Sequence, residues 1–190
     1  MATVLVASVE NLVVACAGYE IVGFHGTSSL ACEEIETNGF LPSKVFSESD
    51  HASLLSMASS LSIDSSTYKE WLGMRSVTFA KQADAAVSHV QNGSSGGQGL
   101  YNVQQVLSEI LALGDDQQKE TATAFVKKLE AIRKAPSVVY AVSLANFGQR
   151  LVKDQHQQLY HYYWNPSLPV PEFSDIGPDR LIAKLSLSKS

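Results

Sequence analysis

Residues 19–39 read YEIVGFHGTSSLACEEIETNG, and this stretch decides the fold. Its first part, Tyr19–His25, is rich in β-branched and aromatic residues and predicts a short strand. Ser28 or Ser29 is placed to N-cap a helix over Leu30–Glu36, which the following asparagine–glycine pair ends. The stretch therefore predicts a strand–helix unit joined by the tripeptide His-Gly-Thr.

The rest of the chain contains further strands and helices. β-Branched and aromatic runs predict three more strands: Arg75–Ala80, Ser137–Leu144 and Leu159–Trp164. Alternating apolar and polar residues predict a final strand over Leu181–Leu187. Apolar residues at helical spacing predict four more helices: Ala52–Leu61, Ala83–Val90, Val103–Leu113 and Gln117–Lys134. We expect an α+β protein in which residues 1–190 form a single domain, with a helical insertion at about residues 101–134.

Length and composition exclude several classes of protein. The 190 residues are 45% hydrophobic and 17% charged, which is typical of a globular domain with a sizeable core. The formal net charge of −5 is a poor match to a nucleic-acid-binding surface, so we expect no nucleic-acid partner. The two cysteines, Cys16 and Cys32, have no metal-binding spacing, and we predict no metal site.

The N-terminal segment Thr3–Gly18, TVLVASVENLVVACAG, is apolar but lacks the features of a signal peptide. It has no basic start, Glu10 and Asn11 interrupt it, and it is shorter than the roughly 20 residues of a membrane span. We interpret it as a buried helix or strand pair, and we expect no membrane association.

The tripeptide at residues 25–27 belongs to a longer pattern. Phe24-His25-Gly26-Thr27-Ser28 is followed by Ile35 and then by Asn38-Gly39-Phe40. In order and spacing this pattern resembles the first motif of the diphtheria-toxin-like and poly(ADP-ribose)-polymerase-like ADP-ribosyltransferases, in which a strand ends in His-Gly-Thr. The resemblance implies a split β-sheet core with flanking helices, and NAD as the co-substrate.

The family implies a role for each residue of this motif. His25 would hydrogen-bond a hydroxyl of the adenosine ribose. The backbone of Gly26 would bond the nicotinamide amide, a close approach that glycine permits. Thr27 and Ser28 would add contacts to NAD. In this chemistry the bond between nicotinamide and ribose breaks through an oxocarbenium-like transition state, as in glycoside hydrolysis.

The second region of the family is a strand with an aromatic residue that stacks on nicotinamide, then a helix with another aromatic about eleven residues later. Here Thr78 and His89 occupy those two positions, and both depart from the pattern. Because threonine cannot stack, Phe79, Trp71 or Tyr68 is expected to supply the aromatic face. The resemblance thus implies cofactor contacts for Trp71, Thr78, Phe79 and His89.

The third element of the family is a glutamate before the last strand, followed by a proline turn. Glu172 stands six residues before Pro178 and matches that layout, with Asp175 as its nearest competitor. The family implies that this glutamate bonds the 2′-hydroxyl of the nicotinamide ribose, stabilises the developing cation and orients or deprotonates the acceptor. Glu172 and His25 are therefore the predicted catalytic residues.

The resemblance implies a monomeric mono-ADP-ribosyltransferase whose acceptor is a protein, such as a host protein. Compact domains of this type are often bacterial toxins or effectors that are secreted or injected into a host cell, here without a cleaved signal; otherwise we expect a cytoplasmic protein. Three alternatives stay open: a tRNA 2′-phosphotransferase, an NAD glycohydrolase and a catalytically silent interaction module with the same fold. The phosphotransferase needs paired arginines and a second histidine on its middle strand, whereas only Arg75 lies near that strand here.

Three segments outside the motifs are candidates for recognition. The serine-rich stretch Ser43–Thr67 is expected to form a mobile loop over the cofactor or a loop that binds the target. The helical insertion is a candidate docking surface for the target. The aromatic run Tyr160–Trp164 fits a wall of the cofactor slot, a loop that recognises the acceptor, or the core.

Overall fold

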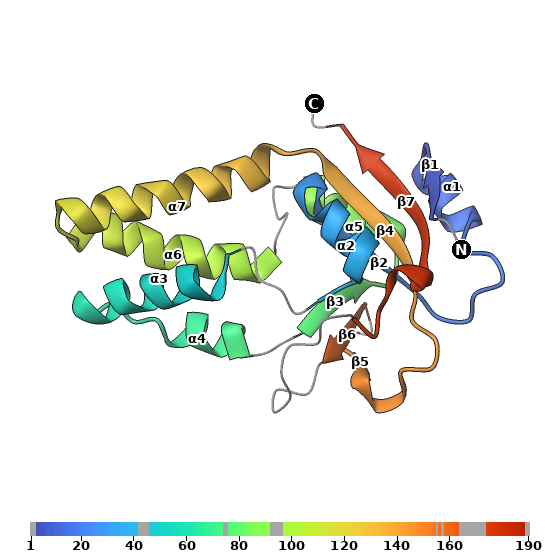
Figure 1. The fold of residues 1–190 in the computed structure, drawn as a ribbon. Coiled ribbons are helices and arrows are strands. Elements are labelled where there is room, and N and C mark those ends of the chain that lie inside the picture. The colour runs from blue at the N-terminus through green and yellow to red at the C-terminus, as the bar shows by residue number, and fades with distance from the viewer. Residues whose placement is uncertain are drawn as a thin grey trace. The chain divides into compact units, whose positions relative to one another are not determined.

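A computed structural model describes residues 3–41, 46–73, 76–91, 97–154, 156, 158–163 and 174–188. Within these residues the protein has seven α-helices and one seven-stranded mixed sheet, which confirms the predicted mixture of helices and strands (Figure 1). The chain divides into two compact units. The sheet unit contains all seven strands, and the helical unit contains four of the helices.

The sheet unit is built on seven strands. In chain order they are β1 (Val4–Val6), β2 (Val22–Ser28), β3 (Ser76–Ala80), β4 (Ser137–Ser143), β5 (Leu151–Lys153), β6 (Leu159–Tyr163) and β7 (Leu181–Leu187). They lie in the order β1-β7-β4-β2-β3-β6-β5. The β1–β7 pair is parallel, and the other neighbouring pairs are antiparallel. Strand β4 lies near the middle and is buried on both faces, which explains its almost unbroken apolar sequence.

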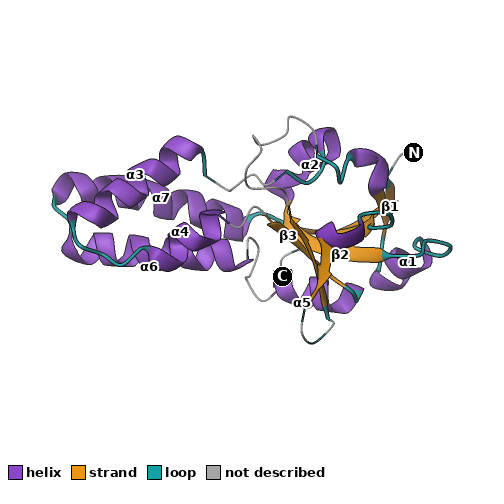
Figure 2. Ribbon diagram, turned by 90° about the horizontal axis from the view of Figure 1, so that it is seen from below, coloured by secondary structure: helices purple, strands orange, loops and turns teal. Residues whose placement is uncertain are grey.

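Helices cover both faces of this sheet (Figure 2). Helices α1 (Val9–Val14) and α5 (Ala83–Gln91) pack on one face, over a core that includes Phe24 and Val139. Helix α2 (Cys32–Asn38) packs on the other face, over a core that includes Phe40 and Tyr140. Three short 3₁₀ helices lie between these elements: η1 (Ser29–Ala31), η2 (Gly148–Arg150) and η3 (Pro178–Arg180).

The predicted strand–helix unit is present, but its strand is shifted along the chain. Strand β2 begins at Val22 rather than Tyr19 and continues through Ser28, because residues 22–28 all pair with β4. The hydroxyl of Ser28 accepts from the backbone amide of Leu30 at 3.3 Å, as its expected capping role requires. Gly39, with a φ of 79°, ends α2 in a conformation that favours glycine.

The prediction of a buried N-terminal segment is wrong for most of that segment. Leu12 is fully buried, whereas Val4, Leu5, Val13 and Val14 are exposed. Strand β1 is an edge strand that pairs with β7 alone, and the six-residue helix α1 is too short to bury more than one side, where Leu12 lies.

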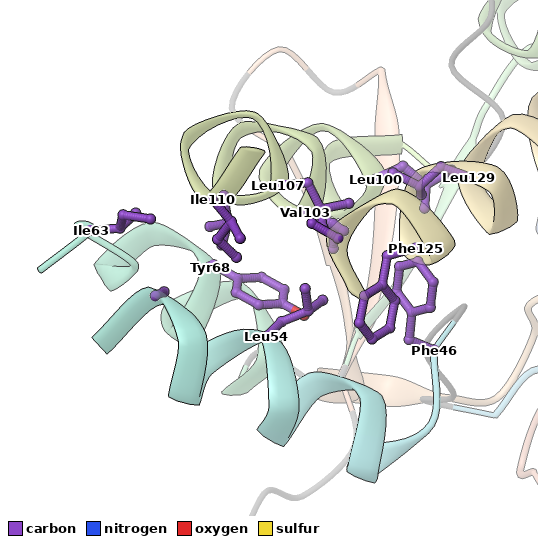
Figure 3. Close-up of a cluster of buried hydrophobic side chains, with 13 residues drawn as sticks. Phe46, Leu54, Ile63, Tyr68, Leu100, Val103, Leu107, Ile110, Phe125 and Leu129 are labelled. Atoms are coloured by element: carbon purple, nitrogen blue, oxygen red, sulfur yellow. The ribbon is translucent and has the colours of Figure 1, made fainter. Parts of the chain in front are cut away.

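The helical unit consists of α3 (Glu48–Ser60), α4 (Ser66–Gly73), α6 (Gly97–Leu113) and α7 (Asp116–Lys134). Helix α6 contacts the other three helices and shares a core with them. Figure 3 shows Tyr68 close to Leu54 in this core, where the rings of Phe46 and Phe125 also meet with their centroids 5.3 Å apart. The insertion predicted at about residues 101–134 corresponds to α6 and α7, and the single-domain organisation stays a prediction.

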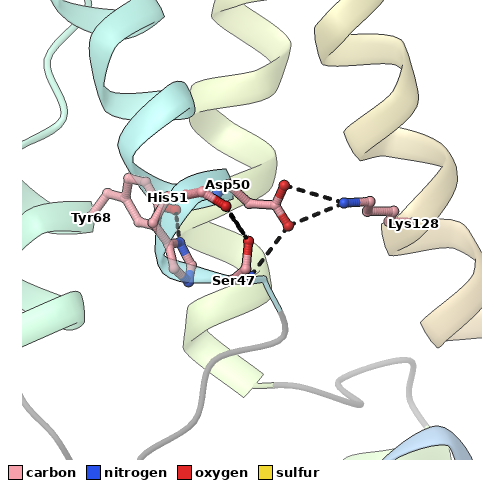
Figure 4. A network of polar contacts seen from close by, with 6 residues as sticks. Ser47, Asp50, His51, Tyr68 and Lys128 are labelled. Atoms are coloured by element: carbon pink, nitrogen blue, oxygen red, sulfur yellow. Dashed lines mark hydrogen bonds and ion pairs between the residues drawn. The ribbon is translucent and has the colours of Figure 1, made fainter.

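Most described residues of the serine-rich stretch are helical rather than part of a loop: they form α3 and the start of α4. Ser47 and Asp50 cap α3 reciprocally: the Asp50 amide donates to Ser47 Oγ at 3.1 Å, and the Ser47 amide donates to Asp50 Oδ2 at 3.2 Å (Figure 4). Lys128 Nζ of α7 lies 3.1 Å from Asp50 Oδ2, and a buried hydrogen bond joins His51 to Tyr68. Packing and capping thus outweigh the low helix propensity of serine.

Candidate functional site

Strand β2 is joined very differently to its two neighbours. Seven residue pairs align β2 with β4, from Val22–Ser143 to Ser28–Ser137. On its other side β2 meets β3 through a single pair, Phe24–Ala80, whereas β3 forms five pairs with β6. The sheet therefore has a seam between β2 and β3, and the residue that follows the single pair on β2 is His25.

His25 bridges the seam with its side chain. Its Nδ1 lies 2.9 Å from the carbonyl oxygen of Thr78; because a carbonyl only accepts, Nδ1 carries the proton and Nε2 is the acceptor of the neutral ring. The ring packs edge-on against Phe40, 4.9 Å between centroids, and beside Phe79, at 5.6 Å. Desolvation lowers the pKa of His25, the bond to Thr78 opposes this, and neighbouring His89 lowers it further. The ring is thus neutral and fixed in orientation.

The three residues after His25 have structural roles or settings within β2. A Cβ added at Gly26 would lie 2.9 Å from the carbonyl oxygen of Ala86, so glycine lets α5 approach the strand closely. Thr27 is half-buried. Ser28 is buried and caps η1 through Leu30. Each residue has a local structural setting, and their contacts with NAD stay predictions.

Thr78 and Phe79 point to opposite faces of β3. Phe79 is fully buried, so this ring, predicted to face the cofactor, lies in the core beside His25. Thr78 is exposed, and its hydroxyl lies 3.1 Å from Nδ1 of His161, its pairing partner on β6. One threonine therefore holds two imidazoles: its carbonyl binds His25 and its hydroxyl binds His161.

The other residues predicted to contact the nicotinamide ring are His89, Trp71 and Tyr68, and none of them shows a direct contact with His25 in the described part of the structure. His89 is exposed on α5, near enough to His25 for its charge to lower the pKa of that residue. Trp71 lies in α4 of the helical unit, and its side chain is outside the described part of the structure. Tyr68 is buried in the core of that unit. Of the predicted residues, Thr78 and Phe79 contact His25, and His89 is connected to His25 through its effect on the pKa of that residue.

The third predicted element is described only in part. Glu172 lies outside the described residues. The described chain resumes at Ser174, whose amide donates to the Asn38 carbonyl at 3.0 Å and whose hydroxyl donates to the Phe40 carbonyl. The amide of Phe40 in turn donates to the Ile176 carbonyl at 3.0 Å. The end of the first motif and the segment after Glu172 are therefore hydrogen-bonded to each other.

Asp175, the competing carboxylate, is engaged in a structural contact. Its Oδ2 accepts from the hydroxyl of Tyr162 at 2.6 Å and from Nη1 of Arg150 at 2.7 Å. The bond from Tyr162 contributes most to lowering the pKa of Asp175, and Arg150 and Arg180 add to it. Asp175 is ionised and paired, and it attaches the 174–176 segment to β6 and η2.

Sequence reasoning included His161 only as part of the aromatic run Tyr160–Trp164 and did not single out this residue, His161, as the partner of Thr78. Its ring lies 6.2 Å from that of Tyr163, with the two planes tilted by 32°. Alternation along Leu159–Tyr163 places both rings on one face of β6. The register between β3 and β6 makes Thr78 the pairing partner of His161. No local sequence pattern reports this register.

Comparisons with known proteins leave the chain without an assigned family. A scan against protein-family models, a search of curated proteins and a search of solved structures each return no match. Among the described residues, no helix is long and apolar enough to cross a membrane. The same residues contain no group of three or more histidine, cysteine, aspartate or glutamate side chains placed to hold a metal ion. The function of the site therefore rests on the geometry of the seam.

Proposed function

We propose that the protein is a mono-ADP-ribosyltransferase, which transfers ADP-ribose from NAD to a protein side chain and releases nicotinamide. The observation that carries this proposal is the setting of His25 at the seam. The ring is neutral and oriented by Thr78, so Nε2 is an acceptor for a ribose hydroxyl. The single β2–β3 pair supports a split form of the sheet, with the motif residues beside the split.

The reaction needs charge stabilisation at the sugar. The bond between the nicotinamide nitrogen and C1′ of its ribose breaks, and both electrons leave with neutral nicotinamide. The acceptor then bonds C1′ and loses its proton to a base. We assign to Glu172 the role of stabilising the cationic sugar in between and of orienting the acceptor.

Two observations favour Glu172 over Asp175 for this role. Asp175 is already bound to Tyr162 and Arg150, so it is not available to a ligand without losing both bonds. Ser174, two residues after Glu172 in the sequence, is hydrogen-bonded to Phe40, whose ring packs on His25. The described segment that begins two residues after Glu172 is thus hydrogen-bonded to the residue whose ring packs on His25.

The test uses labelled NAD with a eukaryotic lysate, and it compares the wild type with Glu172→Gln. We expect the wild type to label a protein and to release nicotinamide, and Glu172→Gln to do both at least about 100-fold more slowly. The matched control is Glu34→Gln, an exposed glutamate of α2, which should leave both rates unchanged.

Other results would redirect the assignment. Nicotinamide release without labelled protein, retained when lysates are varied, would indicate an NAD glycohydrolase. Loss of the 2′-phosphate from tRNA, with that phosphate recovered on the labelled ADP-ribose and no label on protein, would indicate the phosphotransferase. If the wild type neither binds NAD nor releases nicotinamide, the silent interaction module is the remaining reading and the transferase proposal fails.

A further inference from the structure

Strands β3, β6 and β5 lie next to one another at one end of the sheet, and one row of side chains crosses all three (Figure 1). Phe79 of β3 pairs with Tyr160 of β6, which pairs in turn with Lys153 of β5. Residues paired in this way project from the same face of a sheet. The ring of Phe79 also lies 5.6 Å from that of His25, so the row leads from His25 to Lys153 on the face where the His25 ring packs.

Two lysines lie at the Tyr160 ring. Lys81 Nζ is 5.2 Å from the centroid of that ring, and Lys153 is the direct cross-strand neighbour of Tyr160. Lys153 is exposed, and Lys81 and Tyr160 are half-buried. In the part of the chain that the structure describes, neither lysine forms a salt bridge. The far end of the row therefore carries two ammonium groups beside an accessible ring.

The carboxylates on the neighbouring elements bind other groups. Asp175 accepts from Arg150 at 2.7 Å, and Asp154 accepts from the backbone amide of Leu159 at 2.9 Å inside the β5–β6 hairpin. The two lysines stand two strands apart, about 10 Å between their backbones, where like charges still repel each other. Their positive charge is thus available to an anionic ligand, which would also relieve this repulsion.

We propose that Lys81, Tyr160 and Lys153 form a docking surface for an acidic segment of the acceptor protein. This inference rests on the proposed function and deepens it by naming the chemistry of the acceptor. Carboxylates of an extended segment would pair with the two lysines, and its chain would cross the row toward His25. Three strand spacings, about 15 Å, separate β5 from β2, which is the length of about four or five extended residues. The modified side chain should therefore stand within about five residues of the acidic ones.

A nucleic acid fits this surface less well than an acidic peptide segment. A phosphate backbone carries one charge on every nucleotide and is bound by a continuous basic track. Here the carboxylates of Asp154 and Asp175 interrupt the positive charge around the two lysines. A segment with a few separated negative charges matches this pattern.

The test measures binding by fluorescence anisotropy, with a labelled peptide of about ten residues in which glutamate and serine alternate. We expect the wild type to bind it at about 0.05 M salt, more weakly at about 0.3 M, and not to bind the same peptide with glutamine in place of glutamate. Lys153→Gln and Lys81→Gln should each weaken binding about threefold, and the double variant about tenfold. Lys127→Gln is the matched control, because it removes the same charge from an exposed lysine of α7 and should leave the affinity unchanged.

A second measurement connects the surface to the reaction. With labelled NAD and a eukaryotic lysate, Lys153→Gln should label protein about threefold more slowly than the wild type. Its affinity for NAD and its release of nicotinamide without lysate should stay within about twofold, since the surface contacts the acceptor and not the cofactor. Thermal unfolding checks the fold of each variant. If Lys81→Gln does not fold, Lys153→Gln decides the matter, since Lys153 is exposed.

Several results would overturn the proposal. Failure of the wild type to bind the acidic peptide, or an equal loss of affinity in Lys127→Gln, would overturn it while the proposed function stands. A weaker affinity for NAD in Lys153→Gln would assign the surface to the cofactor. Tighter binding of a single-stranded oligonucleotide of about ten nucleotides, lost in the double variant, would assign it to a nucleic acid. A wild type that binds the peptide but neither binds NAD nor releases nicotinamide would overturn the proposed function, and with it the assignment of the docked segment to an acceptor.

Discussion

Strand β2 is bound to its two neighbouring strands by different kinds of contact. Toward β4, seven residue pairs form a continuous ladder through the middle of the sheet. Toward β3 there is one pair, and the remaining contacts come from side chains: the bond of His25 to Thr78 and the packing of Phe40 and Phe79 on the His25 ring. A ladder resists single substitutions because its bonds are made by backbone atoms. The seam depends on a few side chains, so single substitutions should alter it.

This difference explains where the chemistry-bearing residues gather. Along the ladder, backbone groups satisfy one another and the side chains go to the two cores. At the seam the strands part, and polar side chains replace the missing backbone partners, as His25 does at the Thr78 carbonyl.

Among the substitutions that test this difference, Phe40→Ala is expected to lower the free energy of unfolding most. Phe40 is 3% exposed, and its ring lies 5.3 Å from that of Phe79 on the seam side and 6.1 Å from that of Tyr140 on the ladder side, as well as against His25. Removing it leaves a cavity that touches both sides, and we expect the free energy of unfolding in urea to fall by about 4 kcal/mol.

The control for Phe40→Ala is Leu30→Ala, a truncation in the adjoining η1 at a residue that is 64% exposed. It should cost less than about 0.5 kcal/mol. Similar losses for the two variants would show that the Phe40 ring does not link the seam to the ladder.

An intermediate effect is expected from Gly26→Ala, which tests the side of β2 that faces α5. The added Cβ would meet the backbone of α5 at Ala86, so strand and helix must separate. We expect a loss of about 2 kcal/mol in the same urea experiment. Gly73→Ala, where an added Cβ meets nothing within 4 Å, should change stability by less than about 0.5 kcal/mol. Equal effects would mean that α5 can move away from β2 at no cost.

The sequence predicts best those elements whose pattern is complete within their own length. Strand β7 has the predicted bounds, and β4 and α7 differ from prediction by at most one residue at either end. Apolar–polar alternation identifies β7, a run of β-branched residues identifies β4, and a helical repeat identifies α7. Strand β5 has three residues and was not predicted. The start of β2 was misplaced because pairing with β4, and no residue type, determines where that strand begins.

For the candidate site, the sequence predicts only those features that depend on residues close together in the chain. The strand that carries His-Gly-Thr and the helix after it follow from residues 19–39, and they place His25 near the start of a helix. The seam itself and the partnership of Thr78 with His161 follow from strand order and register, which join residues 83 positions apart. The burial of Phe79 likewise follows from which face of β3 meets the core, and a five-residue strand does not show this in its sequence.

The smallest effect expected is a change in the pH dependence of stability in His25→Asn. Desolvation lowers the pKa of His25 below the ordinary 6.5 in the folded protein. Between those two values the unfolded chain binds the proton more readily, so the stability that the neutral ring contributes is complete above about pH 6.5 and is lost as the pH falls toward the folded-state pKa. Asparagine keeps an N–H for the Thr78 carbonyl but binds no proton.

The measurement is the free energy of unfolding of wild type and His25→Asn from pH 7.5 to 5.5. Wild type and His25→Asn share all their other side chains, so the difference between the two curves isolates His25. The advantage of the wild type should shrink by about 1 kcal/mol or less as the pH falls. Parallel curves would contradict the prediction, because they would mean that the folded protein hydrates the His25 ring as well as the unfolded chain does. The seam would then be open to water at His25, and its side-chain contacts would not hold the two strands as the geometry indicates.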